Sequence, residues 1–253
     1  YDTWPFLENV SGVPGDYMDI ATVDGIHLTP VGAYLQARAG EAMTRFLFPP
    51  RYVLPISAAD TYSATNTGGN LVSNPFMLGT AGSKSGGAMD GTVATGFNVR
   101  DGASGVIVSV SAYTDSAGIA WQQVVLTGTP TADGEVEVSF TLPHASMDAA
   151  AVYESVAYID LIGGHFGIDY VTLQLSISSS VSTKTARDLG KTPGDQDGLI
   201  PEGEHITGIW RTPPMQPSGA PTAAKVSLII GCESGTPISA TLKVRAFAVR
   251  ATS

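Results

Sequence analysis

Apolar and polar residues alternate with a period of two along much of the chain after residue 100. The pattern is clearest over residues 135–142 and 171–178, where Val, Phe, Leu or Ile alternates with Glu, Ser, Thr or Gln. Such alternation is typical of strands with one buried and one solvated face. The same pattern, bounded by Gly, Pro, Asp or Ser, predicts further strands at Val106–Tyr113, Trp121–Leu126, Tyr153–Leu161, His205–Arg211, Lys225–Ile230 and Thr241–Arg250.

No helix of crossover length separates these strands, and one polar face per strand is typical of antiparallel sheets. The strands are enough for two packed sheets. The fold is therefore predicted to be mainly β, with an antiparallel β-sandwich as its main part.

One long helix is predicted near the start of the chain. Thr29 can cap it, Pro30 suits its first position, and an apolar stripe at helical spacing runs from Val31 to Phe46 before Pro49 ends it. A polar segment, residues 57–69, follows. We therefore divide the chain into a helical segment at 1–48, a linker at 49–69 and a β-sandwich at 70–253.

Composition narrows the possible partners. The chain is 43% hydrophobic and 14% charged, which indicates a folded protein rather than a disordered one. Its net charge of -10, without a cluster of Lys or Arg, argues against nucleic acid as a partner. An acidic surface with few charges suits neutral polymers such as polysaccharides, or simply solubility. No apolar run approaches the roughly 20 residues that a membrane-spanning helix needs, so we predict no membrane insertion.

Asp24 and His27 form the sharpest chemical motif, in the segment Asp24-Gly25-Ile26-His27 directly before the predicted helix. A carboxylate bonded to one imidazole nitrogen fixes the tautomer and leaves the other nitrogen to accept a proton from a hydroxyl nucleophile. The alternative is a capping turn with a surface histidine.

This segment, with Thr29 and Gly32, resembles the last block of SGNH (GDSL-type) hydrolases, D-G-x-H-x-(S/T/N)-x-x-G. The resemblance covers residues 1 to about 48 and implies that His27 is a general base oriented by Asp24. The family's Gly-Asp-Ser nucleophile block is absent, and so are its recognisable oxyanion-hole blocks. A base without an activated hydroxyl does not hydrolyse an ester. We therefore expect the missing part to precede Tyr1 in a longer protein or to come from another chain.

A second resemblance begins at the predicted sandwich. The segment 70–76, Asn-Leu-Val-Ser-Asn-Pro-Phe, and Gly96-Phe97 further on are similar to the N-L-x-x-N-P opening and G-W continuation of jelly-roll carbohydrate-binding modules. Such modules follow SGNH domains in bacteriophage tail, fibre and spike proteins. The resemblance implies a jelly-roll-like sandwich, a cell-surface polysaccharide and other fibre subunits as partners, a homo-oligomer such as a trimer, and an extracellular or virion-associated location.

Aromatic side chains are the candidates for sugar recognition, because the apolar face of a pyranose stacks on an aromatic ring. We name Trp210, Trp121, Tyr113 and Tyr170, with Tyr153 as a further candidate. Trp210 ranks first because Pro213 and Pro214 end its strand and push it toward a loop. The alternative for each ring is core packing.

The sequence indicates no cofactor and no metal site. Asp195 and Asp197 alternate as in a calcium loop but lack its distal glutamate, so a solvated turn is favoured. The histidines at 144, 165 and 205 have no Cys or acid at metal-ligand spacing. The single cysteine, Cys232, is interpreted as a buried, inert thiol.

Three functions follow from these observations. The first is a receptor- or polysaccharide-binding part of a phage-type fibre or spike that carries the end of an esterase domain. The second is a secreted bacterial carbohydrate esterase with an appended binding module. The third is a purely structural module that oligomerises or docks the protein onto a particle.

Overall fold

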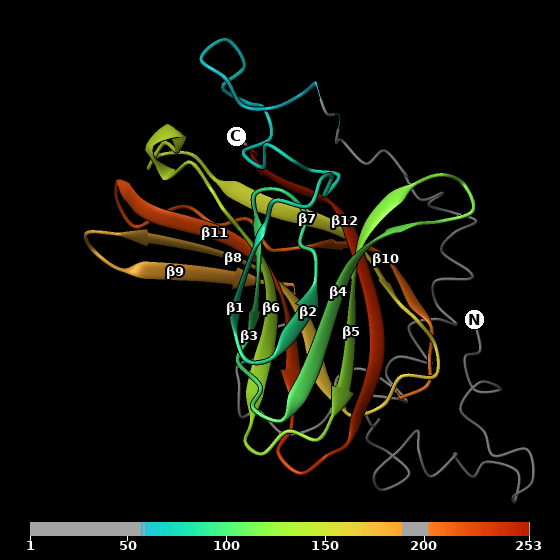
Figure 1. Ribbon diagram of the computed structural model, residues 1–253. Helices are drawn as coiled ribbons and strands as arrows, with labels where there is room; N and C mark the ends of the chain where they lie inside the picture. The colour runs from blue at the N-terminus through green and yellow to red at the C-terminus, as the bar shows by residue number, and fades with distance from the viewer. Residues whose placement is uncertain (1–56, 58, 189–201, 253) are drawn as a thin grey trace, which may run out of the picture. The chain divides into compact units, whose positions relative to one another are not determined.

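Two six-stranded β-sheets contain nearly all the regular structure of the described residues. The computed structural model describes residues 57, 59–188 and 202–252 (Figure 1). The strands are β1 (Ser83–Gly86), β2 (Met89–Gly91), β3 (Phe97–Asp101), β4 (Val106–Thr114), β5 (Ala120–Gly128), β6 (Gly134–Thr141), β7 (Tyr153–Leu161), β8 (Ile168–Ser179), β9 (Thr183–Arg187), β10 (Ile206–Arg211), β11 (Pro221–Cys232) and β12 (Ile238–Ala251). A short 3-10 helix, η2 (His144–Ser146), is the one named helical element among these residues.

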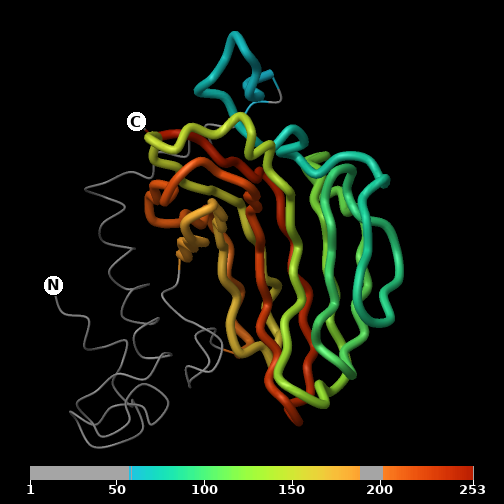
Figure 2. The backbone as a smooth tube through the Cα atoms, turned by 90° about the vertical axis from the view of Figure 1, so that its left-hand side faces the viewer, coloured from blue at the N-terminus to red at the C-terminus, as the bar shows by residue number. Residues whose placement is uncertain are grey.

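The first sheet has the order β1-β3-β6-β11-β8-β9, and the second has the order β10-β7-β12-β5-β4-β2. The chain thus crosses repeatedly between the two sheets, as in a jelly roll. At one end, the turns at 129–133 and 233–237 lie side by side, where the Gly235 amide donates to the Pro130 carbonyl (Figure 2). The prediction of a mainly β sandwich is confirmed.

The two sheets are mixed rather than purely antiparallel, which corrects the sequence prediction. Strand β1 pairs parallel with β3, and β2 pairs parallel with β4, while the other ladders are antiparallel. Both parallel strands are edge strands of three or four residues. Their sequences are SKSG and MDG, so they carry no apolar alternation from which a strand could be predicted.

The eight strands predicted from alternation are all present. They correspond to β4–β8 and β10–β12, with ends that differ by a few residues. Strands β3 and β9 were not predicted, because each has five residues and few apolar positions. Alternation therefore identified the strands of six or more residues and missed the shorter ones.

The core lies between the sheets and consists mainly of Val, Leu and Ile side chains with a small aromatic cluster. Phe97 of β3 packs against Phe140 of the same sheet, with ring centroids 5.1 Å apart, and against Phe247 of β12 at 5.4 Å. Each fully buried side chain of this size stabilises the fold by about 1.5–3 kcal/mol. These contacts join the two layers and fix which face of each sheet points outward.

The Asn-Leu-Val-Ser-Asn-Pro segment has a structural role in the sandwich. Asn70 is 1% exposed, and its side-chain amide donates to the Phe247 carbonyl while its Oδ1 accepts from the amides of Val72 and Val249. Asn74 likewise donates to the carbonyls of Leu78 and Thr95. The two asparagines therefore attach the start of the sandwich to strand β12 and to the loop before β3.

Part of the sequence prediction lies outside the described residues. This part comprises the helical segment 1–48, with Asp24 and His27, and the acidic turn at 195–198. Within the predicted linker, Asp60 forms an ion pair with Arg250 of β12 at 2.6 Å, and its carbonyl accepts from the Asn70 amide. The boundary at residue 70 stays a prediction.

Candidate functional site

Strands β4, β5, β12 and β7 are neighbours in the second sheet (Figure 1). Together they place aromatic and cationic side chains on its outer surface. The register places Tyr113 of β4 opposite Trp121 of β5, and Tyr158 of β7 opposite Arg245 of β12. Val244 and Ile159, which alternate with them, are fully buried in the core. Their neighbours therefore point outward. We call the set Tyr113, Trp121, Tyr158, Lys243 and Arg245 the aromatic face.

Cations and rings of the aromatic face contact one another directly. The Trp121 and Tyr158 rings meet edge to face at 5.3 Å, and the Arg245 guanidinium carbon lies 4.7 Å and 5.3 Å from their respective centroids. Lys243 Nζ lies 4.1 Å above the Tyr113 ring. Cation–π contacts of this length hold long side chains in place while their outer donors stay available.

Trp121 is the best fixed of the three rings. It is 6% exposed, and its indole N–H donates to Asp115 Oδ2 at 3.0 Å. Asp115 Oδ1 accepts from the Ala117 and Ile119 amides, both at 2.9 Å. The bond from the Ile119 amide, followed by that from the Trp121 indole, lowers the pKa of Asp115, so its carboxyl is ionised at neutral pH. Tyr113 and Tyr158 are half-buried and offer the more accessible ring surface.

A polar rim borders the aromatic face on strands β7 and β10. Asp160 accepts from His205 Nε2 at 2.6 Å and lies 3.7 Å from Lys243 Nζ. Arg211 pairs with Glu154 at 3.2 Å. Together with the Thr207 hydroxyl of β10, which donates to the Tyr158 hydroxyl, the rim offers hydroxyl, carboxylate and imidazole groups beside the rings. Such groups can exchange hydrogen bonds with sugar hydroxyls.

Two of the four predicted sugar-binding residues come together here, and two do not. Trp121 and Tyr113 are direct neighbours on the aromatic face. Trp210 pairs with Ala157, so it is half-buried on the opposite surface of the same sheet. Tyr170 is 4% exposed and belongs to the first sheet, and Tyr153 is also 4% exposed, with its hydroxyl accepting from the Asp148 amide. Sugar contact stays a prediction for all of them.

Sequence reasoning missed Tyr158, Lys243, Arg245 and Asp160. Each of these residues lies at an outward-facing position of a predicted strand. The alternation that predicts the strand therefore also predicts that their side chains point outward. Proximity to proline, which favours Trp210, does not indicate on which face of a strand a ring lies. His205, interpreted as a strand or loop histidine, precedes β10 and contacts Asp160.

No family model matches this chain. No curated protein matches it significantly by sequence. A search of solved structures returned carbohydrate-binding modules of the β-sandwich superfamily at 10% identity and a TM-score of 0.40, over 61% of this chain and 56% of that one. The CBM22-1 xylan-binding domain of Paenibacillus barcinonensis Xyn10C matches at 17% identity and a TM-score of 0.41, over 73% and 95% respectively. The family 11 module of Lic26A-Cel5E from Clostridium thermocellum matches at 14% identity and a TM-score of 0.34, over 64% and 91%.

These structural similarities are weak. The fold of this chain is therefore assigned from its own strand order and register.

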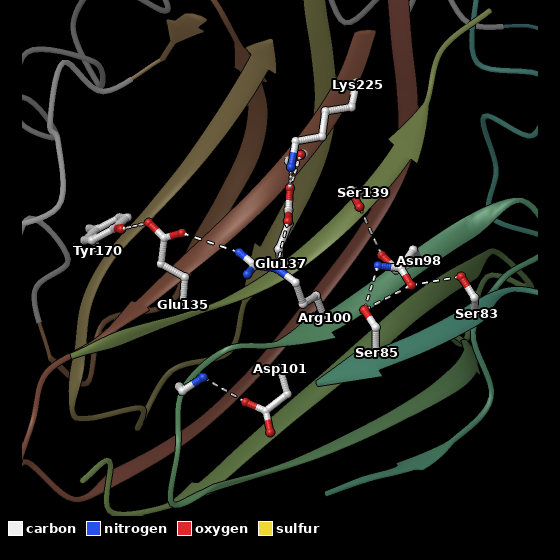
Figure 3. Close-up of polar contacts among 12 residues, drawn as sticks. Ser83, Ser85, Asn98, Arg100, Asp101, Glu135, Glu137, Ser139, Tyr170 and Lys225 are labelled. Carbon is white, nitrogen blue, oxygen red and sulfur yellow. Dashed lines mark hydrogen bonds and ion pairs between the residues drawn. The ribbon is translucent and has the colours of Figure 1, made fainter. Parts of the chain in front are cut away.

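The outer surface of the first sheet is also polar, but its groups are paired with one another (Figure 3). Glu137 of β6 accepts from Lys225 at 2.6 Å, from Ser227, and from Arg100 Nε at 3.3 Å. Burial opposes its charge, yet the bonds from Lys225 and Ser227 and the attraction of Arg100 outweigh burial and keep the pKa of Glu137 below its usual value. We call Arg100, Glu135, Glu137, Tyr170 and Lys225 the polar face.

Tyr170 is part of this internal pairing. Its hydroxyl donates to Glu135, and its ring covers Gly231 on β11. A Cβ at Gly231 would lie 2.2 Å from the Tyr170 ring, so only glycine fits there. Burial and the Glu135 carboxylate raise the pKa of Tyr170. The tyrosine thus packs within the polar face.

The described part of the chain was also compared with what metal ligation, a reactive thiol and a membrane span require. No group of three or more His, Cys, Asp or Glu side chains there could hold a metal ion. Cys232 is buried, and burial raises the pKa of its thiol to about 12, so the prediction of a buried thiol is confirmed. None of the helices in this part has the length and hydropathy needed to cross a membrane.

Proposed function

We propose that the sandwich binds polysaccharide through the aromatic face. The observation that carries the proposal is the convergence of Tyr113, Trp121 and Tyr158 on one outer sheet surface, with charged and hydroxyl groups at its rim. A pyranose presents apolar C–H groups on its faces and hydroxyls at its edge, so it can use both parts of this surface together.

The two half-buried tyrosines would supply the stacking surface in this proposal. Tyr158 also accepts a hydrogen bond from Thr207 at 3.3 Å, which orients its hydroxyl along strand β10. Asp160 and His205 would exchange hydrogen bonds with sugar hydroxyls beside it. A sheet surface with several such rings favours an extended polymer over a single small sugar.

Glycan-array screening of the full chain, followed by calorimetry on the retained glycans, tests the proposal. Tyr113→Ala and Tyr158→Ala should each weaken binding by about 0.5–1.5 kcal/mol, the contribution of one stacked aromatic contact. Tyr170→Ala on the first sheet is the matched control, and once thermal unfolding shows that this variant is folded, its affinity should be unchanged. An array without retained glycans would favour the purely structural module.

We also propose the wider setting that the Asp24–His27 motif suggests. In it the sandwich serves as the receptor-binding part of an extracellular or virion-associated fibre or spike, beside the end of an SGNH-type esterase domain. A secreted bacterial esterase with an appended binding module is the alternative. A virion-anchoring segment in the complete gene product would favour the fibre, and its absence would favour the secreted enzyme.

Catalysis is tested separately from binding. In a complete protein that carries the nucleophile serine, His27→Ala should abolish hydrolysis of p-nitrophenyl acetate, while Tyr158→Ala should leave it intact. Unchanged turnover in His27→Ala would remove the histidine from the mechanism. Light scattering of the same protein distinguishes a trimer from a monomer.

A further inference from the structure

Arg245 differs from every other cationic side chain in the described residues. Each of the others forms a hydrogen bond or an ion pair with a named acceptor: Lys84 with the Gly91 carbonyl, Arg100 and Lys225 with Glu137, Lys184 with the Gln216 carbonyl, Arg187 with Gln174, Arg211 with Glu154, Lys243 with Asp160, and Arg250 with Asp60. Arg245 contacts only the rings of Trp121 and Tyr158. Its Nε is buried without a hydrogen-bond partner, as is the Nε of Arg250, but Arg250 has Asp60 as a contacting anion and Arg245 has none.

The nearest acid does not take up this cation. Asp115 attracts Arg245, but its Oδ1 accepts from two backbone amides and its Oδ2 accepts from the Trp121 indole. Both carboxylate oxygens thus already have donors. The guanidinium is held in position by aromatic rings, and its hydrogen-bonding capacity is not used within the described protein.

A backbone irregularity lies directly beside Arg245. The β12–β7 register shifts between Arg245 and Ala248, and Ala246 has a φ of 58° although it is not a glycine. A left-handed alanine costs about 1–2 kcal/mol. Bulges of this kind re-aim the side chains next to them and are common beside functional sites. Here Phe247 enters the core, while Arg245 lies over the two rings.

We infer that Arg245 binds a carboxylate of an acidic polysaccharide on the aromatic face, an inference that rests on the proposed function. A guanidinium offers two parallel N–H donors that match the two oxygens of a carboxylate, and a stacked guanidinium is already oriented for such a bond. A neutral hydroxyl would use only part of this donor set.

The surrounding charges indicate how densely the ligand carries acid groups. Lys243 and Arg211 are compensated by Asp160 and Glu154, so the face has one cation without a contacting anion. The net charge of -10 repels a dense polyanion. The ligand class is therefore a largely neutral glycan with isolated uronic acids.

Calorimetry with matched oligosaccharides tests this inference. The probes are xanthan-derived oligosaccharides, which carry glucuronic acid on a glucan, and the same oligosaccharides after reduction of the carboxyl group to an alcohol. At about 0.15 M NaCl, the native form should bind roughly ten-fold more tightly than the reduced form, since a hydrogen bond to a charged group contributes more than one between neutral groups. Salt at about 0.5 M should weaken the native form alone.

Arg245→Gln should make the two forms bind equally, and Arg245→Lys should retain part of the preference. Arg100→Gln on the polar face of the first sheet is the control with the same change of residue type and charge, and it should keep the preference. Thermal unfolding verifies that each variant is folded.

The outcomes separate the two proposals. Equal binding of both forms by the original protein, or an unchanged preference in Arg245→Gln, overturns the role of Arg245 and leaves polysaccharide binding intact. Affinity that survives Tyr113→Ala and Tyr158→Ala together would overturn the aromatic face as the site. Array hits that are all neutral, or a complete lack of binding, likewise overturn the carboxylate inference.

Discussion

The two outer surfaces of the sandwich are both rich in charged and aromatic residues, but they use them differently. On the polar face, Glu137 has three donors around it and the Tyr170 hydroxyl is bonded to Glu135. On the aromatic face, Arg245 meets only ring surfaces. The side chains of the polar face bond to one another, while the aromatic face leaves the Arg245 guanidinium available to a ligand.

This difference separates structural from functional polarity on the geometry of the side chains alone. A buried polar group with complete pairing contributes to stability, and its removal leaves partners unsatisfied. A positioned polar group without a partner has a cost for the fold, and a ligand can supply the missing contact. Counting aromatic residues would not distinguish the two surfaces, because each contains a buried one.

Trp121→Ala is expected to have the largest effect of these substitutions, on both stability and glycan binding. The ring is 6% exposed and supports Arg245 and Tyr158, so its removal should cost about 3–5 kcal/mol of unfolding free energy as well as glycan binding. Trp121→Phe keeps a ring but loses the bond to Asp115, for a cost of about 1 kcal/mol. Urea denaturation measures both. If Trp121→Ala were as stable as the original protein, the ring would have no role in supporting the face.

Glu137→Gln should affect stability alone and so sharpen the contrast. The substitution keeps the shape but removes the charge that Lys225 and Arg100 bind. The two cations are nearly half exposed and can regain water, so we expect a loss of about 2 kcal/mol rather than the larger cost of breaking a fully buried pair. Glycan affinity should not change. Weakened binding in a folded Glu137→Gln variant would show that the polar face also contacts ligand.

The pH dependence of Glu137 gives an independent measurement of the same pairing. Its pKa is lowered in the folded protein, so the unfolded chain binds the proton more readily. The stability from this group is fully present above its ordinary value of 4.5 and is lost as the pH falls through the lower folded value. Urea midpoints measured from neutral pH into the acid range should therefore fall less steeply in Glu137→Gln. Parallel pH profiles would contradict the assignment.

Tyr170→Phe should have a smaller effect. It removes one buried hydroxyl bonded to a carboxylate, and Glu135 can still attract Arg100, whose Nη2 lies 4.0 Å away. We expect a loss of about 1 kcal/mol and unchanged glycan affinity. The measurement also tests whether the Tyr170 hydroxyl contacts sugar. Reduced affinity with unchanged stability would show that Tyr170 contacts sugar. The polar face would then bind ligand as well as the aromatic face.

The sequence predicted the long strands because each buries every second residue against the opposite sheet. Val136, Val138 and Phe140 illustrate the pattern that fixed β6 and its inward face. Strands β1 and β2 could not be predicted, since they are short, solvent-facing edge strands joined to the sheet by parallel backbone pairing. Backbone hydrogen bonds do not depend on residue type. The parallel pairing of β1 and β2 therefore could not be predicted from the sequence.

The candidate site was predictable only in part. Tyr113 and Trp121 could be named as aromatic residues in strands, but their proximity depends on the register of β4 against β5. Trp210 differs from them by one step of alternation, which moves its side chain to the other surface of the sheet. The role of Arg245 depends on a bulge at an alanine, a residue type that gives no sequence signal for a left-handed backbone.

Ala246 provides the smallest and most specific test of what sets the aromatic face apart. Replacement by glycine removes the cost of the left-handed conformation, about 1–2 kcal/mol, but it also removes a methyl group that is fully buried and adds freedom to the unfolded chain. These effects oppose each other, so Ala246→Gly should change the unfolding free energy by less than about 1 kcal/mol and preserve the preference for carboxylate-bearing glycans. Ala246→Val keeps the left-handed cost and adds β-branching in a filled core, so it should lower both stability and the preference. If glycine and valine behaved alike in urea denaturation, the backbone at 246 would not be left-handed, and the bulge could no longer explain how Arg245 is held over the two rings.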